Sequence, residues 1–159
     1  FKEIEKAGKF LSIDLADGDE QVEDMEYLIA QCPDLKIAIG HFGMVTTPRW
    51  QKQIALAKHK NVYIESGGLT WLFHKEFYPY PSAIDAILEA RDICGMEKLM
   101  WGSDYPRTMT DITYIMAVRF IAESEKLTEA EKRAFLGENA VKFYGFEKME
   151  PMEDTPNML

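Results

Sequence analysis

Several features that define common protein classes are scarce in this sequence. Its 159 residues include two cysteines, Cys32 and Cys94, and no apolar run near the roughly 20 residues needed to span a bilayer. No Gly-x-Gly-x-x-Gly motif follows the first predicted strand, so nothing favours a dinucleotide site. The cysteines lack motif spacing, so we expect reduced, buried thiols in a cytoplasmic protein, with a single disulfide as the less favoured alternative.

Basic residues are outnumbered as well. Lys and Arg total 18 against 27 Asp and Glu, which gives a formal net charge of −9. A domain this acidic repels nucleic acid and anionic membranes, and no basic stripe along the sequence opposes that expectation. The first residues are mainly charged, unlike a signal peptide. Because the chain begins at Phe1 and not at a methionine, we expect a processed or incomplete polypeptide.

The sequence does contain a regular alternation of predicted strands and helices. Short apolar segments predict strands at residues 10–15, 35–40, 61–66 and 98–103. Helical patterns follow them at residues 20–32, 48–59, 82–95, 111–125 and 128–137, and a short last turn covers 139–144. This order indicates an α/β fold with a parallel sheet, and an open doubly wound sheet and a barrel both fit it.

Local signals predict where some of these helices begin and end. Thr128 and Glu131 have the spacing of a capping box, and Ser82 with Asp85 has a weaker form of it. Gly137 is expected to break the helix that begins near Thr128. Residues 1–147 are predicted to form one domain, and residues 148–159 a flexible acidic tail.

A polar residue stands at or near the carboxyl end of each predicted strand. These residues are Asp14, His41, Glu65 and Asp104. Ligands bind at this edge of parallel α/β folds, and burying a lone charge is costly, so four such residues together predict a site.

The four residues differ in what they predict. His41, between glycines, is expected to act as a ligand or a general acid/base, and a hydrogen-bonded loop histidine is the alternative. Asp104 is expected to bind a metal or take a proton from water, although an aspartate in this position can also cap a turn. For Asp14, a structural role and a chemical role are equally expected. Glu65 is expected mainly to bond the backbone of its own glycine loop.

The loops after the strands contain candidate substrate-binding residues. Arg107 and Arg49 have the shape for a bidentate contact with a substrate carboxylate. Trp71 and His74 could contribute to a lid over a substrate, and a loop packed on its own aromatic side chains is an equal alternative.

Three segments together resemble one known family. They are residues 35–43, with Gly-His-Phe-Gly at their end, residues 101–106 (Trp-Gly-Ser-Asp-Tyr-Pro), and residues 136–145, with Leu-Gly-Glu-Asn-Ala and Phe-Tyr-Gly. The chain resembles the amidohydrolase 2 family of the amidohydrolase superfamily. This branch includes aminocarboxymuconate semialdehyde decarboxylase, aromatic-acid decarboxylases and pyrone-dicarboxylate lactonases.

The resemblance implies a fold and a site. The fold would be the C-terminal half of a distorted (β/α)8 TIM barrel, strands five to eight with their helices, because a whole barrel has about 250 residues. His41 matches the family's sixth-strand histidine, and Asp104 matches its eighth-strand aspartate, which helps to hold a divalent ion, often zinc. The first-strand His-x-His pair is absent, and Asp14 stands where the family has a fifth-strand histidine. Asp104 and Asp14 are therefore the implied metal ligands.

The functional hypotheses follow from this resemblance. The first is a metal-dependent hydrolase of a small, carboxylate-bearing substrate, with Asp104 and His41 catalytic; a decarboxylase of aromatic or muconate-type acids and a metal-independent lactonase are alternatives. The isolated chain is expected to be inactive. The second hypothesis is a non-catalytic half-barrel that associates with the N-terminal half of the barrel or with a second copy of the chain, because its sheet edges would otherwise stay unpaired. Loss of the missing half, or its presence in another chain, is a third possibility.

Overall fold

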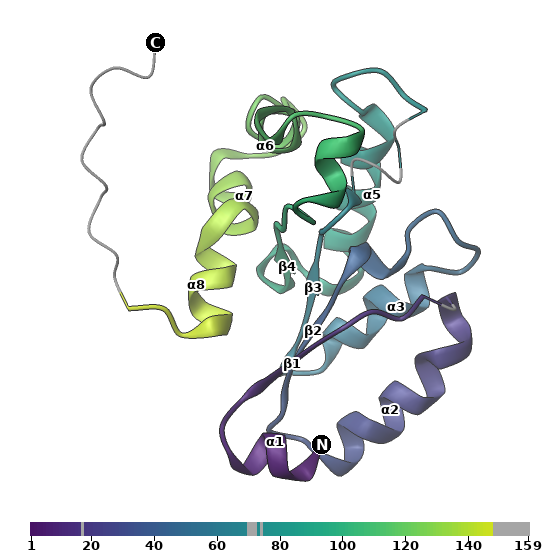
Figure 1. Cartoon of the computed structure of the whole chain (residues 1–159), viewed down its shortest axis with the longest axis vertical. Helices are drawn as coiled ribbons and strands as arrows, with labels where there is room; N and C mark the ends of the chain where they lie inside the picture. Colours follow the sequence, from purple (N-terminus) through teal and green to yellow (C-terminus); the bar gives the residue numbers. More distant parts are fainter. Residues whose placement is uncertain (17, 70–72, 74, 148–159) are drawn as a thin grey trace.

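The computed structural model describes residues 1–16, 18–69, 73 and 75–147. Its centre is a parallel sheet of four strands in the order β1-β2-β3-β4 (Figure 1). The strands are β1 (Phe10–Ile13), β2 (Lys36–Ile39), β3 (Val62–Glu65) and β4 (Leu99–Met100). All four predicted strands are present, and each is shorter than its predicted range. β4 ends early because the next amides bond elsewhere: Trp101 N–H donates to the Phe135 carbonyl (2.8 Å) and Gly102 N–H to Ser66 Oγ (3.2 Å).

Helices follow the strands as predicted, with one addition. The α-helices are α1 (Lys2–Lys6), α2 (Val22–Gln31), α3 (Gln51–Ala55), α5 (Pro81–Cys94), α6 (Tyr114–Ala122), α7 (Glu129–Arg133) and α8 (Asn139–Tyr144). Short 3-10 turns are η1 (Gly18–Gln21), η2 (His41–Gly43), η3 (Leu56–Lys58), η4 (Met96–Lys98) and η5 (Arg107–Thr110), and η6 (Ala134–Glu138) is a π-helical turn. The sequence patterns did not predict α1.

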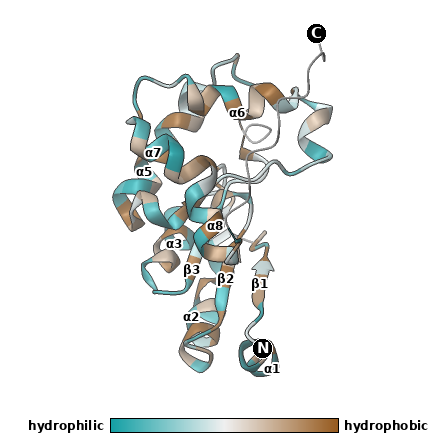
Figure 2. Ribbon diagram, turned by 90° about the vertical axis from the view of Figure 1, so that its left-hand side faces the viewer, coloured by the Kyte–Doolittle hydropathy of each residue, from teal (hydrophilic) through white to brown (hydrophobic). Residues whose placement is uncertain are grey.

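The sheet lies between two layers of helices. Figure 1 shows α2, α3 and α5 on one side of the strands and α7 and α8 on the other. Alternate residues of the strands face these two layers, so Ile37 and Ile64 join the large core beneath the first layer, whereas Tyr63 packs with Phe143 of α8 on the opposite face. Figure 2 shows hydrophobic and hydrophilic residues together on α2 and α5, as expected of helices that bury one side.

β1 is an edge strand and is the least buried of the four. Within the described residues it pairs with β2 alone, from Phe10 opposite Lys36 to Ile13 opposite Ile39. Phe10 is 47% exposed, whereas Ile37 and Ile39 in the neighbouring strand are fully buried. The sheet therefore ends on a strand that still offers backbone groups and apolar surface.

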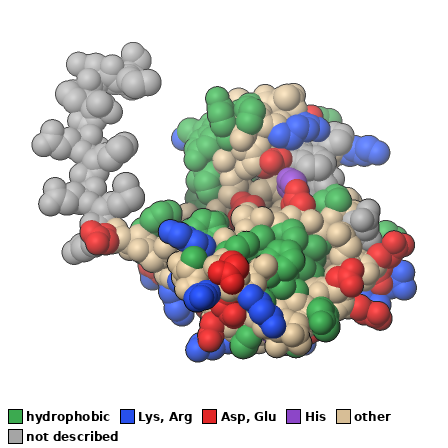
Figure 3. Space-filling model, turned by 60° about the horizontal axis from the view of Figure 1, so that its bottom comes forward, with side chains coloured by type: hydrophobic (Ala, Val, Ile, Leu, Met, Phe, Trp, Pro, Cys, Tyr) green, Lys and Arg blue, Asp and Glu red, His purple; other side chains and the backbone are tan. Residues whose placement is uncertain are grey.

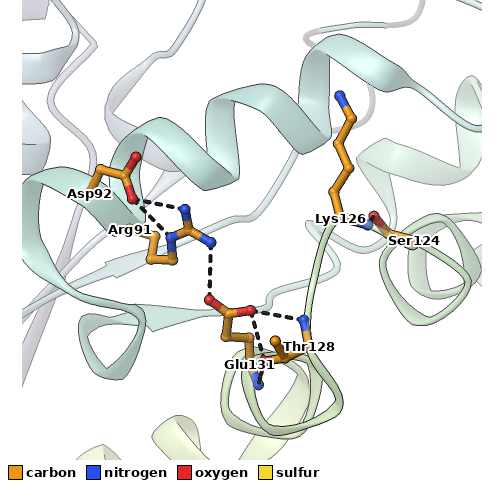
Figure 4. A network of polar contacts seen from close by, with 6 residues as sticks. All are labelled: Arg91, Asp92, Ser124, Lys126, Thr128 and Glu131. Carbon is orange, nitrogen blue, oxygen red and sulfur yellow. Dashed lines mark hydrogen bonds and ion pairs between the residues drawn. The ribbon is translucent and has the colours of Figure 1, made fainter.

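The two predicted capping boxes have different outcomes. Thr128 and Glu131 form theirs at the start of α7, and Arg91 of α5 reaches the same glutamate, with 3.1 Å between Arg91 Nη1 and Glu131 Oε1 (Figure 4). The box predicted at Ser82 is wrong. Pro81 already occupies the first position of α5, so Ser82 lies inside the first turn, where its N–H donates to Glu76 Oε2 (3.0 Å).

The predicted helix break at Gly137 is also wrong. The chain passes from α7 through η6 into α8 without interruption, and Gly137 lies inside the π-helical turn. A glycine inside a helix costs about 1 kcal/mol relative to alanine, and tertiary contacts offset that cost here. Phe135 is fully buried, and the buried Asn139 side chain donates to the carbonyls of Met96 (2.8 Å) and Leu99 (2.7 Å).

Both cysteines are free thiols, as predicted, although only Cys32 is fully buried. Desolvation raises the pKa of the Cys94 thiol to about 11. In the part of the chain that the structure describes, no helix has the length and apolar character required to cross a bilayer. The predicted tail, residues 148–159, lies outside the described residues.

Candidate functional site

The carboxyl ends of the strands surround one cleft. Its volume is about 240 Å³. It is lined by Ser12, Ile13, Asp14, Gly40, His41, Glu65, Gly67 and Asp104. All four residues predicted at the strand ends are therefore brought together. Figure 3 shows histidine and acidic side chains side by side in a hollow of the surface.

His41 lies between two carboxylates. Its Nδ1 is 2.7 Å from Asp14 Oδ1, and its Nε2 is 3.5 Å from Asp104 Oδ1. With Nδ1 held at Asp14, the ring places Nε2 on the side that faces Asp104 and the cleft. The side chains of His41 and Asp104 are 24% and 22% exposed, so both are partly shielded but reachable from the cleft.

The backbone at both residues adopts a conformation that side chains rarely favour. φ is +52° at His41 and +50° at Asp104, in the left-handed region. Such residues cost about 1 kcal/mol or more each and cluster at functional sites. Two of them in one cleft support a role for these side chains beyond closing a turn.

Glu65 is the most perturbed acid of the cleft. Burial raises the pKa of its carboxyl to about 7, against the opposing effects of the Gly67 N–H, which donates to Oε1 (2.9 Å), and of His41. The negative charges of Asp104 and Asp14 raise the pKa further. The predicted bond to its own glycine loop is thus present, and the same carboxyl also lines the cleft.

Two glycines leave room for the acids of the cleft. A Cβ at Gly102 would lie 1.1 Å from Glu65 Oε1, and a Cβ at Gly40 would lie 2.7 Å from Asp14 Oδ1. A side chain at either position would have to displace the carboxyl group from the place it occupies here. Gly40, next to His41, therefore leaves space for the Asp14 carboxylate, and Gly102, near Asp104, leaves space for the Glu65 carboxyl.

The predicted substrate-binding residues are not part of the described cleft lining. Arg107 Nη1 lies 2.6 Å from Asp111 Oδ2, and Arg49 Nη2 lies 3.1 Å from Asp19 Oδ1. Each arginine thus contacts a nearby carboxylate. Trp71 and His74 lie outside the described residues.

Ser12 of β1 also lines the cleft, although it was not predicted as a site residue. It lies two residues before Asp14, so the period of two along a strand places both on one face. That spacing is the signal in the sequence that could have identified it.

The described residues do not complete a metal site. Carboxylate and imidazole groups are suitable ligands for zinc or manganese. Among the residues that the structure describes, however, no three His, Cys, Asp or Glu side chains are grouped around a common point. Asp14 and Asp104 instead lie at the two ring nitrogens of His41.

Comparison with known families confirms the predicted resemblance. The amidohydrolase family model matches residues 18–146, which is more than half of the chain. The chain belongs to the amidohydrolase family. A search of curated proteins finds no match for this amidohydrolase-family chain.

Solved structures show the fold of this amidohydrolase-family chain. An amidohydrolase from Burkholderia multivorans with bound zinc has a TM-score of 0.74 at 19% identity, over 91% of this chain and 55% of that one. A probable 2-pyrone-4,6-dicarboxylic acid hydrolase from Acinetobacter baumannii, with citric acid bound, has a TM-score of 0.65 at 23% identity. The match covers 91% of this chain and 55% of that one.

A third similar structure is a decarboxylase. The 5-carboxyvanillate decarboxylase from Novosphingobium aromaticivorans, complexed with manganese and 4-hydroxy-3-methoxy-5-nitrobenzoic acid, has a TM-score of 0.61 at 15% identity, over 92% of this chain and 50% of that one. The chain therefore spans about half the length of the structures it matches. Its four parallel strands and their helices correspond to half of an amidohydrolase (β/α)8 barrel.

Proposed function

We propose that the polypeptide to which this chain belongs hydrolyses a small, carboxylate-bearing substrate, with His41 and Asp104 as catalytic residues. The observation that supports this most strongly is the placement of His41 between Asp14 and Asp104 at the carboxyl end of the sheet. Family membership and the cleft at the edge where barrel enzymes bind their substrates point in the same direction.

The proposed roles follow from the distances. Asp14 accepts a hydrogen bond from His41 Nδ1 and so fixes the orientation of the ring. His41 Nε2 and Asp104 Oδ1 lie 3.5 Å apart at the cleft. Either group would take a proton from a water molecule that enters the cleft. Arg107, three residues after Asp104, is the proposed contact for a substrate carboxylate, for which it would exchange its contact with Asp111.

We also propose a divalent ion, zinc or manganese, in the complete protein. Support comes from the ions bound in two similar structures and from the ligand chemistry of Asp104 and Asp14. An ion bound there would act as a Lewis acid. Since the described residues provide no group of three ligands, further ligands must come from elsewhere in the protein. Elemental analysis of the purified full-length protein, and activity after chelation, test this proposal; full activity without metal would favour the lactonase alternative.

Decarboxylation is the second candidate reaction. It requires delivery of a proton to carbon, and Glu65, with a pKa of about 7, can hold one inside the cleft near neutral pH. The fold it shares with a carboxyvanillate decarboxylase agrees with this chemistry. Release of CO2 from a panel of hydroxylated aromatic acids, compared with ring opening of a panel of lactones, distinguishes the two reactions.

A complementary half of the barrel is the proposed partner. The edge strand β1 and the coverage of about half of each similar structure support it. The N-terminal half of a barrel, or a second copy of this chain, would pair with the exposed edge. Light scattering of the isolated chain tests the second copy, and a stable monomer that gains activity only with an N-terminal half would identify the first.

Substitution of the catalytic pair tests the proposed function. In the full-length protein, we expect His41→Asn and Asp104→Asn each to reduce kcat/KM by about 100-fold or more, because each removes a proton-transfer group. The matched control is Asp85→Asn, which removes an exposed carboxylate of α5 that pairs with Lys126. Unchanged turnover in both cleft variants would contradict the proposal.

A further inference from the structure

The opposite end of the sheet carries a second hollow, of about 430 Å³. It is lined by Lys36, Lys58, Lys60, Asn61, Tyr63, Glu97, Lys98, Lys142 and Phe143. Its lysines come from the residues at or before the starts of β2, β3 and β4, and from α8. Figure 3, which brings the lower side of Figure 1 forward, shows basic side chains gathered on this side of the molecule.

The charge of this hollow is opposite to that of the chain. Five lysines and one glutamate give it a formal charge of +4, whereas the whole chain carries −9. Among the described residues, none of the five lysines lies within 4.0 Å of a carboxylate oxygen. Eight other lysine and arginine residues do: Arg49, Lys52, Arg91, Arg107, Arg119, Lys126, Lys132 and Arg133.

Two of the lysines are held in place by the backbone. Lys98 Nζ donates to the carbonyls of His59 (2.9 Å) and Lys60 (2.7 Å) and lies 4.7 Å from the centre of the Tyr63 ring. Lys36 Nζ donates to the Phe143 carbonyl (2.9 Å). Burial lowers the pKa of Lys98, and the like charge of Lys142 lowers it further, while Glu97 opposes the effect. Fixed ammonium groups in a partly desolvated hollow attract anions.

We propose that this hollow binds a small anion with at least two negative charges, of the phosphate or phosphate-ester class. The volume matches that of small-molecule sites, which begin near 300 Å³. Lysine ammonium groups bind phosphate as point charges, and several of them together favour an anion that carries more than one negative charge; lysines are the basic residues among the described residues that line the hollow. Because Lys142 belongs to α8 and the other lysines to the ends of strands and turns, the bound anion would link α8 to the sheet.

Pyrophosphate is a suitable probe for this site. Calorimetric titration of the chain at constant ionic strength is expected to show saturable binding of pyrophosphate and a rise in Tm with its concentration. The variant Lys58→Gln/Lys142→Gln is expected to weaken binding by about tenfold or more, since it removes two ammonium groups from the hollow. Both lysines are exposed, so the variant should fold, and its Tm without anion should equal or exceed that of the parent.

The control variant is Lys2→Gln/Lys6→Gln, which makes the same charge change on α1, outside the hollow. It should bind pyrophosphate like the parent. Equal weakening in both variants, or no binding by the parent, would overturn the proposal. Tighter binding of citrate than of pyrophosphate would overturn the assignment to phosphate. Loss of binding in the full-length protein would show that its other residues neutralise the lysines, and would also overturn it.

Discussion

The two ends of the same four strands have opposite chemistry. At the carboxyl end, three carboxylates and one histidine share a cleft of about 240 Å³; at the amino end, five lysines share a hollow of about 430 Å³. The acids lie at or shortly after the carboxyl ends of strands, whereas the lysines come from the first residue of β2, from turns and from α8. The net charge of a chain therefore does not predict the charge of each of its surfaces.

The largest effect on stability is expected at the carboxyl end, where Gly102 and Glu65 are closest. Gly102→Ala should lower the free energy of unfolding by about 2 kcal/mol, because the new methyl group displaces the Glu65 carboxyl, which then loses its hydrogen bond from the Gly67 N–H. Urea unfolding measures this change. The double variant Gly102→Ala/Glu65→Ala should recover most of it.

Gly137→Ala provides the control for this prediction. A Cβ at this position meets nothing within 4 Å, and the residue lies in a helical turn. We expect a stabilisation of up to about 1 kcal/mol. If both alanine variants lost equal stability, the close approach of Gly102 to Glu65 would not be the cause.

The raised pKa of Glu65 predicts a pH dependence of stability. Between the ordinary value of 4.5 and about 7, the folded chain keeps a proton that the unfolded chain releases, so the free energy of unfolding falls as the pH rises through this window. The loss should reach about 2 kcal/mol by pH 8, after allowance for solvent screening. Glu65→Gln should remove this slope.

Urea unfolding at several pH values measures the slope, with Glu129→Gln as control. Glu129 is exposed on α7, and its pKa is lowered by the hydrogen bond from Lys132, so its substitution should leave the slope above pH 5 unchanged. Parallel curves for the parent and Glu65→Gln from pH 4.5 to 8 would contradict a protonated Glu65 in the folded chain.

Substitutions at the amino end of the strands should change the free energy of unfolding less, and they should do so by removing hydrogen bonds. Lys98→Met should cost about 1–2 kcal/mol, because the carbonyls of His59 and Lys60 lose a charged donor. Lys60→Met, which removes an exposed ammonium group from the same hollow, should change stability by less than about 0.5 kcal/mol. Thermal unfolding of the two variants compares them directly; equal losses would mean that the carbonyl contacts contribute nothing.

The carboxyl end could be predicted from the sequence because its residues follow strands. Apolar segments bounded by Asp14, His41, Glu65 and Asp104 identified both the strands and the site, and parallel pairing brought the four together. The same reasoning could not show that Arg107 contacts Asp111. That choice of partner depends on the local turn η5, which has no strong sequence signal.

The amino end could not be predicted in this way. Lys58, Lys98 and Lys142 are separated by about 40 residues at each step, so they form no stripe along the sequence and meet only through the fold. The predicted helix break at Gly137 failed for a related reason. Burial of Phe135 and the bonds of Asn139, both tertiary interactions, outweigh the local preference of glycine.

The π-helical turn η6 determines the rotational phase of α8. Each residue of a helix advances it by about 100°, so adding or deleting one residue between Ala134 and Glu138 would rotate everything that follows by that angle. Asn139 would then turn away from the carbonyls of Met96 and Leu99. Phe143 would turn away from Tyr63 and from the face of the sheet on which Tyr63 lies. The length of this one turn therefore determines which residues α8 presents to the sheet.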